Sequence, residues 1–323
     1  MNVQQSFKIA FISDLHVDFY VPAGSNGYKL EKRMNDYIDN HLKLQNADIL
    51  VFAGDNSHYP QQNATLLKLI ANKKIYKKIF ITFGNHDLYL ISNNQKNQFK
   101  YSWEKVLFAK KLYSEIEGVE FLDGNVVDVD GFKIGGTGMW YDFSYGIDKH
   151  NHTEREMHEL WNRFSNDANL IFGRDAPNTV TEKFDFHYDS YGGRKREIHA
   201  SFNPLNFFKQ EKEKMEKIIH EVDVFVSHVG PTIPPNLLPK YDRPEMGFYF
   251  FDGGEYLLAE NSPKLWIFGH VHTRCNYKIG NTRLVCNPLG YKDQNLKHQT
   301  AVIDLSTIDG FNFDTLFIQK KIV

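Results

Sequence analysis

The chain has 323 residues, a formal net charge of −2, 24% charged residues and 41% hydrophobic residues, which is an ordinary composition for a globular protein. This balance gives no sign of a nucleic-acid-binding face or a polybasic membrane patch. No apolar run approaches the ~20 residues that cross a bilayer, and the polar start lacks the pattern of a signal peptide. We expect a cytoplasmic protein without a membrane partner. Its two cysteines, Cys275 and Cys286, could pair, but we favour free thiols.

The first part of the chain alternates short apolar runs with segments of helical periodicity. The sequence predicts strands and helices in this order: a strand at 7–12, a helix at 30–44, a strand at 48–53, a helix at 65–70, a strand at 75–83 and a helix at 103–116. Three strand-like runs follow, at 119–122, 125–129 and 132–136. The β-α-β-α-β order is typical of a buried α/β sheet with helices on both faces.

Residues from about 142 to 203 differ from the rest because they are polar and charged. They carry the histidines at 150, 152, 158, 187 and 199. We interpret them as a partly helical cap, inserted into a single domain that spans residues 1–323. After the insertion the sequence predicts a helix at 205–220, followed by strands at 222–226, 265–268, 283–286, 301–305 and 311–317.

Five of the predicted strands end in side chains that bind metals. The clusters are Asp14-Leu15-His16, Gly54-Asp55-Asn56, Gly84-Asn85-His86-Asp87, Ser227-His228 and Gly269-His270-Val271-His272. Ligands of open α/β sheets lie at the carboxyl ends of the strands, so these clusters converge if their strands share a sheet. The glycines permit sharp turns and close backbone approach at these ends.

The residue types in these clusters indicate which metals would suit them. Carboxylate, imidazole and amide donors favour Mn, Fe or Zn, and Mn is our preferred assignment. The clusters contain no cysteine, which argues against a structural zinc site of the thiolate type. Seven donors are enough for two divalent ions if one carboxylate bridges them.

In this order, the five motifs resemble those of the calcineurin-like metallophosphoesterase superfamily. The resemblance implies a four-layer α/β/β/α sandwich with two mixed sheets. It also implies two metal positions that share Asp55, the first with Asp14, His16 and His272, and the second with Asn85, His228 and His270.

The resemblance further implies a dinuclear phosphoesterase in which His86 is the general acid and Asp87 orients its imidazole. A hydroxide that bridges the two metals would attack phosphorus, because coordination lowers the pKa of water. Protonation of the leaving oxygen by His86 would contribute typically ~10²–10⁴-fold to the rate.

The sequence departs from the Ser/Thr protein phosphatases of this superfamily, which carry Asp-Arg-Gly soon after the Gly-Asp motif and Glu after Asn-His. Here Asp55 is followed by Asn56-Ser57-His58-Tyr59, and Asp87 follows Asn-His. We therefore favour a phosphodiesterase that acts on a small phosphoester, with a nucleotide as one candidate. A phosphomonoesterase or a protein phosphatase is the alternative. An inactive metal-binding scaffold is less favoured, because no motif residue is missing.

Several other side chains are weaker candidates for the site. Arg274 is interpreted either as a contact to a phosphate oxygen or as a surface group, and His58 and Asn56 are candidates for the pocket lining. Trp140 and Tyr141 are more typical of core packing than of stacking on a substrate ring. The insertion histidines suggest a third metal, but a solvent-exposed helix face explains them more simply.

Overall fold

Five short strands form a first sheet that is parallel except at one edge. The computed structural model describes residues 6–173, 202–238, 240–294 and 299–310. The order of the first sheet is β11-β1-β2-β3-β4, and only the β11–β1 pair is antiparallel. The bounds are β1 Lys8–Ile12, β2 Ile49–Ala53, β3 Lys78–Thr82, β4 Val119–Phe121 and β11 Ala301–Asp304.

A second sheet has six strands in the order β5-β6-β7-β8-β10-β9. Its four central strands are parallel, and an antiparallel strand closes each edge. The bounds are β5 Asn125–Val129, β6 Phe132–Gly136, β7 Val224–Val226, β8 Leu265–Phe268, β9 Cys275–Ile279 and β10 Thr282–Cys286.

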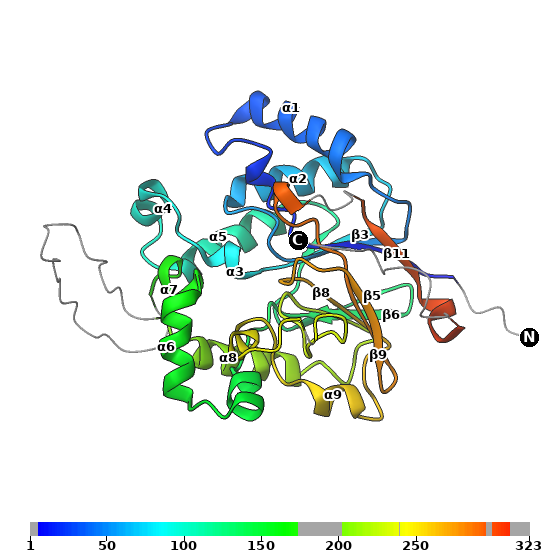
Figure 1. Cartoon of the computed structure of the whole chain (residues 1–323). Helices are drawn as coiled ribbons and strands as arrows, with labels where there is room; N and C mark the ends of the chain where they lie inside the picture. Colours follow the sequence, from blue (N-terminus) through cyan, green and yellow to red (C-terminus); the bar gives the residue numbers. More distant parts are fainter. Residues whose placement is uncertain (1–5, 174–201, 239, 295–298, 311–323) are drawn as a thin grey trace, which may run out of the picture.

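The two sheets pack face to face, and helices cover both outer faces (Figure 1). Alternate residues of β1 show the layering, because Ile9 and Phe11 lie in the core between the sheets whereas Ala10 and Ile12 face the helices. Helices α1 (Gly27–Tyr37), α2 (Pro60–Asn72) and α5 (Ser102–Ser114) cover the first sheet. Helices α6 (Glu154–Phe164), α8 (Pro204–Glu216) and α9 (Gly254–Leu258) lie on the side of the second. The predicted α/β/β/α sandwich is confirmed.

The shorter helical elements occupy the loops between these layers. They are η1 Val17–Phe19, η2 Ile38–Leu42, α3 Asn85–Leu88, α4 Asn93–Gln98, η3 Tyr145–Lys149, α7 Asp167–Leu170, η4 Pro244–Phe248, η5 Lys292–Gln294 and η6 Leu305–Gly310. Within the described residues, the insertion contains η3, α6 and α7, so its predicted partly helical character is confirmed there. His187 and His199 lie outside the described residues, as does the strand predicted at 311–317.

The structure corrects three details of the sequence prediction. The five strands that end in metal-binding side chains do not share one sheet, because β1, β2 and β3 belong to the first sheet and β7 and β8 to the second. Helix α2 begins at Pro60 rather than at residue 65, since proline is well suited to the first helical turn. Strand β9 is absent from the prediction because its half-buried pattern is weak.

Two further observations concern the cysteines and the helices. Cys275 and Cys286 are free and buried, and they are register partners on β9 and β10. The preference for free thiols is therefore confirmed. In the described part of the chain, no helix combines the length and the apolar character that crossing a membrane requires.

Candidate metal centre

The carboxyl ends of strands from both sheets meet at one place. The amide of Asp14 donates to the carbonyl of Gly54 at 3.1 Å, which joins the ends of β1 and β2. The amide of His270 donates to Asp14 Oδ1 at 3.2 Å, which joins the two sheets. Residues that are as much as 256 positions apart along the chain thus become neighbours.

Strained backbone marks this place. Asp14, His16, Asp55 and His270 have positive φ angles of 53°, 43°, 56° and 68°. Side chains other than glycine rarely adopt this region, and such strain gathers at functional sites. Each of these residues directly follows or closely follows a strand, so the turn redirects its side chain into the space beyond the strand ends.

Two glycines make room for the donors. A Cβ at Gly84 would lie 2.1 Å from Asp55 Oδ1, so a side chain there would displace the carboxylate. Gly54 has a φ of 84°, and a Cβ would lie 2.5 Å from His228 Nδ1. The glycines predicted to allow close approach therefore do so against the site residues themselves.

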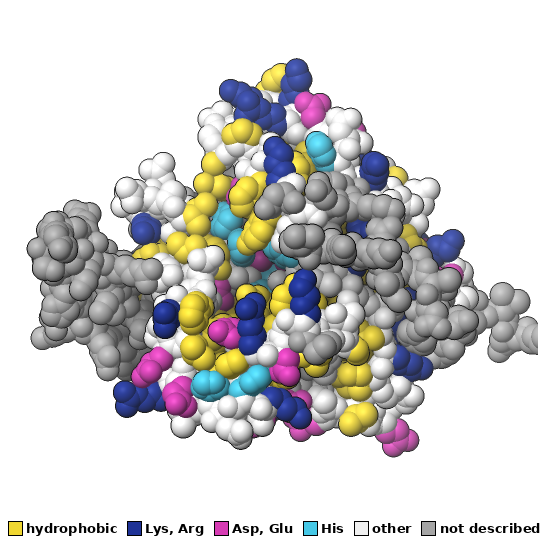
Figure 2. All heavy atoms as spheres, viewed as in Figure 1, with side chains coloured by type: hydrophobic (Ala, Val, Ile, Leu, Met, Phe, Trp, Pro, Cys, Tyr) yellow, Lys and Arg dark blue, Asp and Glu magenta, His cyan; other side chains and the backbone are white. Residues whose placement is uncertain are grey.

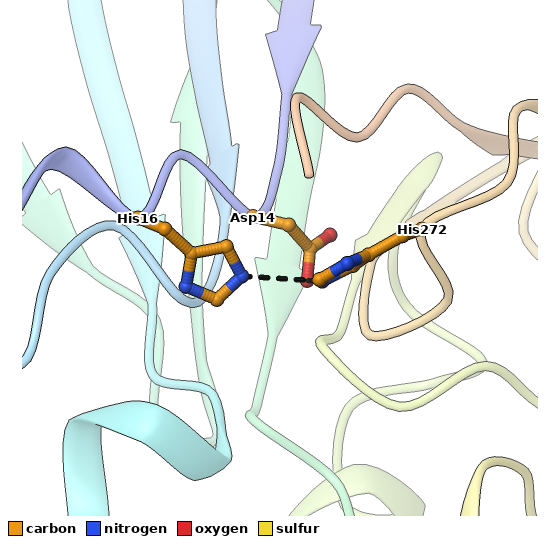
Figure 3. Close-up of side chains that lie close together, drawn as sticks. All are labelled: Asp14, His16 and His272. Atoms are coloured by element: carbon orange, nitrogen blue, oxygen red, sulfur yellow. Dashed lines mark hydrogen bonds and ion pairs between the residues drawn. The ribbon is translucent and has the colours of Figure 1, made fainter. Parts of the chain in front are cut away.

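One group of donors consists of Asp14, His16 and His272 (Figure 3). His16 Nε2 lies 3.1 Å from His272 Nε2, and His272 Nε2 lies 3.5 Å from Asp14 Oδ1. One ligand atom from each residue lies within 4.8 Å of the other two. Asp14 and His16 come from the end of β1, whereas His272 comes from the loop after β8.

A second group gathers around the side-chain oxygen of Asn85. Asn85 Oδ1 lies 3.1 Å from His228 Nε2 and 3.2 Å from His270 Nδ1. Asp55 Oδ2 lies 3.3 Å from His228 Nε2, and Asp55 also clusters with His16 of the first group. Asp55 therefore lies between the two groups, where a bridging ligand would be needed.

Three of the histidines are held by hydrogen bonds on their outer nitrogens. The acceptors are Ala53 O for His228 Nδ1 at 2.8 Å, Phe248 O for His270 Nε2 at 3.1 Å, and Gln294 Oε1 for His272 Nδ1 at 2.8 Å. A proton on each outer nitrogen leaves the inner nitrogen with a lone pair that faces the other donors. Facing lone pairs at about 3 Å repel unless a cation or a proton lies between them. The donor set fits divalent cations.

The charges of the carboxylates agree with this arrangement. Burial alone raises the pKa values of Asp14 and Asp55, but contacts with His272 and His228 outweigh it and hold both pKa values below the usual range. Burial lowers the pKa of His16 to about 4. These groups are therefore deprotonated at neutral pH, which metal binding requires. Burial also opposes the charged form of His228, but Asp55 raises its pKa to about 9, so a cation would have to displace the proton that lies between His228 Nε2 and Asp55.

His86 is buried beside the donors and belongs to a chain of hydrogen bonds. Its Nδ1 lies 2.9 Å from His58 Nε2, and His58 Nδ1 lies 2.7 Å from Asp18 Oδ2. Its Nε2 lies 3.8 Å from Asp55 Oδ2 and 3.4 Å from the hydroxyl of Tyr291. Burial lowers the pKa of His86 well below its ordinary value. The inner nitrogen of His86 thus faces the site, while His58 and Asp18 support its outer nitrogen.

The structure gives the carboxylate of Asp87 other partners than the imidazole of His86, whose Nδ1 contacts His58. The Asp87 carboxylate accepts from the amide of Gly84 at 2.7 Å, from the amide of Asp55 at 3.3 Å and from Asn63 Nδ2 at 3.3 Å. Burial and the charge of Asp55 raise its pKa to about 6. Its carboxylate closes the turn that begins α3 and connects that turn with the loop that carries Asp55.

A cavity of about 550 Å³ opens above the donors. Histidine side chains are visible in a depression near the middle of the face that Figure 2 presents, with hydrophobic side chains around it. Two segments supply its upper lining: Phe164, Ser165, Asn166 and Asp167 of the insertion, and Leu237, Tyr241, Arg243, Glu245, Met246, Phe248 and Tyr249 of the segment before α9. We call these two segments, apart from Asp167, the cavity wall.

The weaker candidates have mixed outcomes. His58 contacts His86, as described above, whereas Asn56 is buried beside Asp55 and Arg274 is half-buried outside the cavity lining. Trp140 and Tyr141 are fully buried, which confirms the packing interpretation. The insertion histidines at 150, 152 and 158 contact separate acidic residues, so no third cluster forms among the described residues.

Sequence reasoning missed most of the cavity wall and several supporting residues. Asp18, Asp167 and Gln294 follow no strand and belong to no motif, so nothing in their local pattern identified them. Tyr291 follows Gly290, whose amide donates to the carbonyl of Asp14 at 3.0 Å. Arg243 belongs to no sequence motif, and only the tertiary fold brings it to the cavity.

One solved structure supports the fold. A phosphopantetheinyl hydrolase from Mycobacterium tuberculosis superposes with a TM-score of 0.62 and 14% identity, covering 88% of this chain and 90% of that one. A putative 5'-nucleotidase from Staphylococcus aureus gives a TM-score of 0.39 and 14% identity, covering 88% of this chain and 49% of that one. No curated protein sequence matches this chain significantly.

The sandwich fold and the buried Asp/His clusters define a metal-dependent phosphoric ester hydrolase. The sequence model of the calcineurin-like phosphoesterase family matches residues 7–274, and the chain belongs to that family. Members of the family typically bind two divalent metals.

Proposed function

We propose that this protein hydrolyses a small phosphodiester with the help of two divalent cations. Mn is the favoured metal at both positions. Asp14, His16 and His272 would hold one cation, Asn85, His228 and His270 would hold the other, and Asp55 would be shared between them. The observation that carries the proposal is the convergence of all seven donors, with inner nitrogens and oxygens 3.1–3.5 Å apart. When bound, the cations would polarise the phosphate and supply a nucleophile at neutral pH.

His86 is the general acid in this proposal. Burial lowers the pKa of His86, so the ring acts as an acid only after the His58–His86 pair has gained a proton. That proton would leave a hydrogen on His86 Nε2 whichever ring holds the shared proton of the 2.9 Å contact. Asp18 stabilises the positive charge of the pair through its 2.7 Å contact with His58. An anionic phosphoester beside His86 favours the protonated ring further. His86 can then protonate the leaving oxygen while His58 restores its outer proton.

A diester suits the composition of the cavity. The described lining contains one arginine, Arg243, which is exposed, and no arginine pair that would match a dianionic phosphate. Aromatic and apolar side chains of the cavity wall offer contacts to the alcohol groups of a diester, and a nucleotide is one candidate. Free thiols that face each other on β9 and β10 agree with a reducing compartment, and we propose a cytoplasmic location.

Parallel assays with Mn test this proposal. We expect turnover of bis-p-nitrophenyl phosphate to exceed that of p-nitrophenyl phosphate in kcat/KM, and EDTA to abolish both. A preference for the monoester would replace the diester with the alternative, a phosphomonoesterase. Activity on neither ester would favour the inactive scaffold. Activity on a phosphoprotein would favour the protein phosphatase. A screen of nucleotides, cyclic nucleotides and a phosphopantetheinyl-bearing substrate would then narrow the substrate class.

A further inference from the structure

Asp167 is a buried carboxylate that the insertion places next to a proposed metal ligand. It begins α7 and is 3% exposed. Its Oδ1 accepts from Asn85 Nδ2 at 2.9 Å and from the Tyr89 hydroxyl at 2.5 Å. Its Oδ2 accepts from the Tyr141 hydroxyl at 2.6 Å. Three hydrogen-bond donors thus hold this buried carboxylate in one orientation. Asp167 belongs to none of the sequence motifs and has no part in the proposed mechanism.

The hydrogen atoms in this network fix the side-chain amide of Asn85. The phenol of Tyr89 has one hydrogen, and it donates that hydrogen to Asp167. The oxygen of Tyr89 is then an acceptor, and it receives the second amide hydrogen of Asn85 at 2.9 Å. Both amide hydrogens of Asn85 are occupied, so its Oδ1 points toward His228 and His270.

The segment that carries Asp167 is docked firmly on the core. The amide of Leu90 donates to the carbonyl of Leu170 at 2.9 Å, and the amide of Ser102 donates to the carbonyl of Phe172 at 2.8 Å. Trp161 Nε1 on α6 donates to the hydroxyl of Tyr141 at 2.5 Å. The position of Asp167 is therefore set by both ends of its segment.

We propose that Asp167 is a positioning residue for Asn85, through which the insertion completes the second cation position. The inference rests on the proposed function, since it assumes that Asn85 is a ligand. Asn85 follows β3 on the core, but the carboxylate that directs its oxygen comes from the insertion, 82 positions later. The negative charge of Asp167 also favours a cation beside Asn85. The insertion thus orients a metal ligand in addition to lining the cavity.

The variant Asp167→Asn tests this inference with metal binding as its readout. The new amide nearly preserves the shape, but it removes the negative charge and replaces one of the two carboxylate acceptors with a donor. We expect the wild-type protein to bind two Mn ions in titration calorimetry without substrate. In Asp167→Asn, one ion should bind as before, and the other should bind roughly 10–100-fold more weakly. Glu159→Gln, on the same insertion but with a side chain that is 63% exposed, is the matched control and should bind as wild type.

Equal affinities for both ions in wild type and Asp167→Asn would overturn the inference. If wild type itself bound fewer than two ions, the proposed metal centre would fall instead, so the two failures are distinguishable. Thermal melting of the metal-free proteins establishes whether each variant folds. If Asp167→Asn does not fold, Tyr89→Phe replaces it, because that change removes the acceptor for Asn85 and keeps the ring. Unchanged affinity in a folded Tyr89→Phe would equally overturn the inference.

Discussion

The floor of the cavity and its wall are built in opposite ways. The floor consists of polar donors at strand ends, which are buried or half-buried, have a positive φ at four positions and are held by hydrogen bonds. The wall includes side chains such as Tyr249 and Phe164, which are 42% and 56% exposed and come from segments without strands. This difference separates the chemistry, which needs fixed geometry, from substrate selection, which depends on exposed contacts.

The largest effect that tests this difference between floor and wall is expected at Asp55, the carboxylate between the two donor groups. In Asp55→Ala we expect the loss of both cations and a fall of turnover to background, because both positions share this ligand. Mn content after gel filtration and turnover of bis-p-nitrophenyl phosphate measure the effect. Asp39→Ala, with a side chain that is 61% exposed, is the control. Full occupancy by two ions in Asp55→Ala would refute the bridging role.

The next largest effect concerns His86, which belongs to the floor but not to the donor groups. His86→Ala should keep its metal content and lose roughly 10²–10⁴-fold in kcat on a diester with a poor leaving group. The loss should be smaller for p-nitrophenolate, which needs little protonation. Equal losses for both leaving groups would remove the general-acid role of His86.

A moderate effect is expected at His58, whose ring contacts His86 Nδ1 on the side away from the cavity. Removing a hydrogen bond to a charged group costs about 1.5–3 kcal/mol, so His58→Ala should lower kcat roughly 10–100-fold on the poor leaving group. The double variant with His86→Ala should be no slower than His86→Ala alone, because both residues act through one imidazole. Additive losses would show that His58 acts independently.

The smallest effect is expected in the wall. Tyr249→Ala or Phe164→Ala should raise KM about 2- to 10-fold for a diester that carries an aromatic ring, the value of one aromatic contact. A dialkyl phosphodiester should be affected less, and Mn binding should not change. If either variant altered Mn affinity, the floor and the wall would not be separate.

The sequence predicted the floor well and the wall poorly, for physical reasons. Strands such as β1 and β2 are recognisable as apolar runs, and the donors closely follow them. The local sequence pattern was therefore sufficient to identify the donors. The contact of His86 with His58 was not predicted, because this contact depends on which loop lies beside the ring. That loop holds His58, 28 positions earlier. The wall depends on packing between the insertion and the segment before α9, and no local period records such packing.

The antiparallel pairing of β11 with β1 has a consequence for how the molecule is made. Strand β1, which carries Asp14 and His16 beyond its end, is flanked by β2 on one side and by residues 301–304 on the other. Strand β1 therefore gains its second neighbour only after residues 301–304 have emerged from the ribosome. Pairings this distant in sequence form late and slowly. The strand that leads into Asp14 and His16 thus has one unpaired edge until β11 has been made.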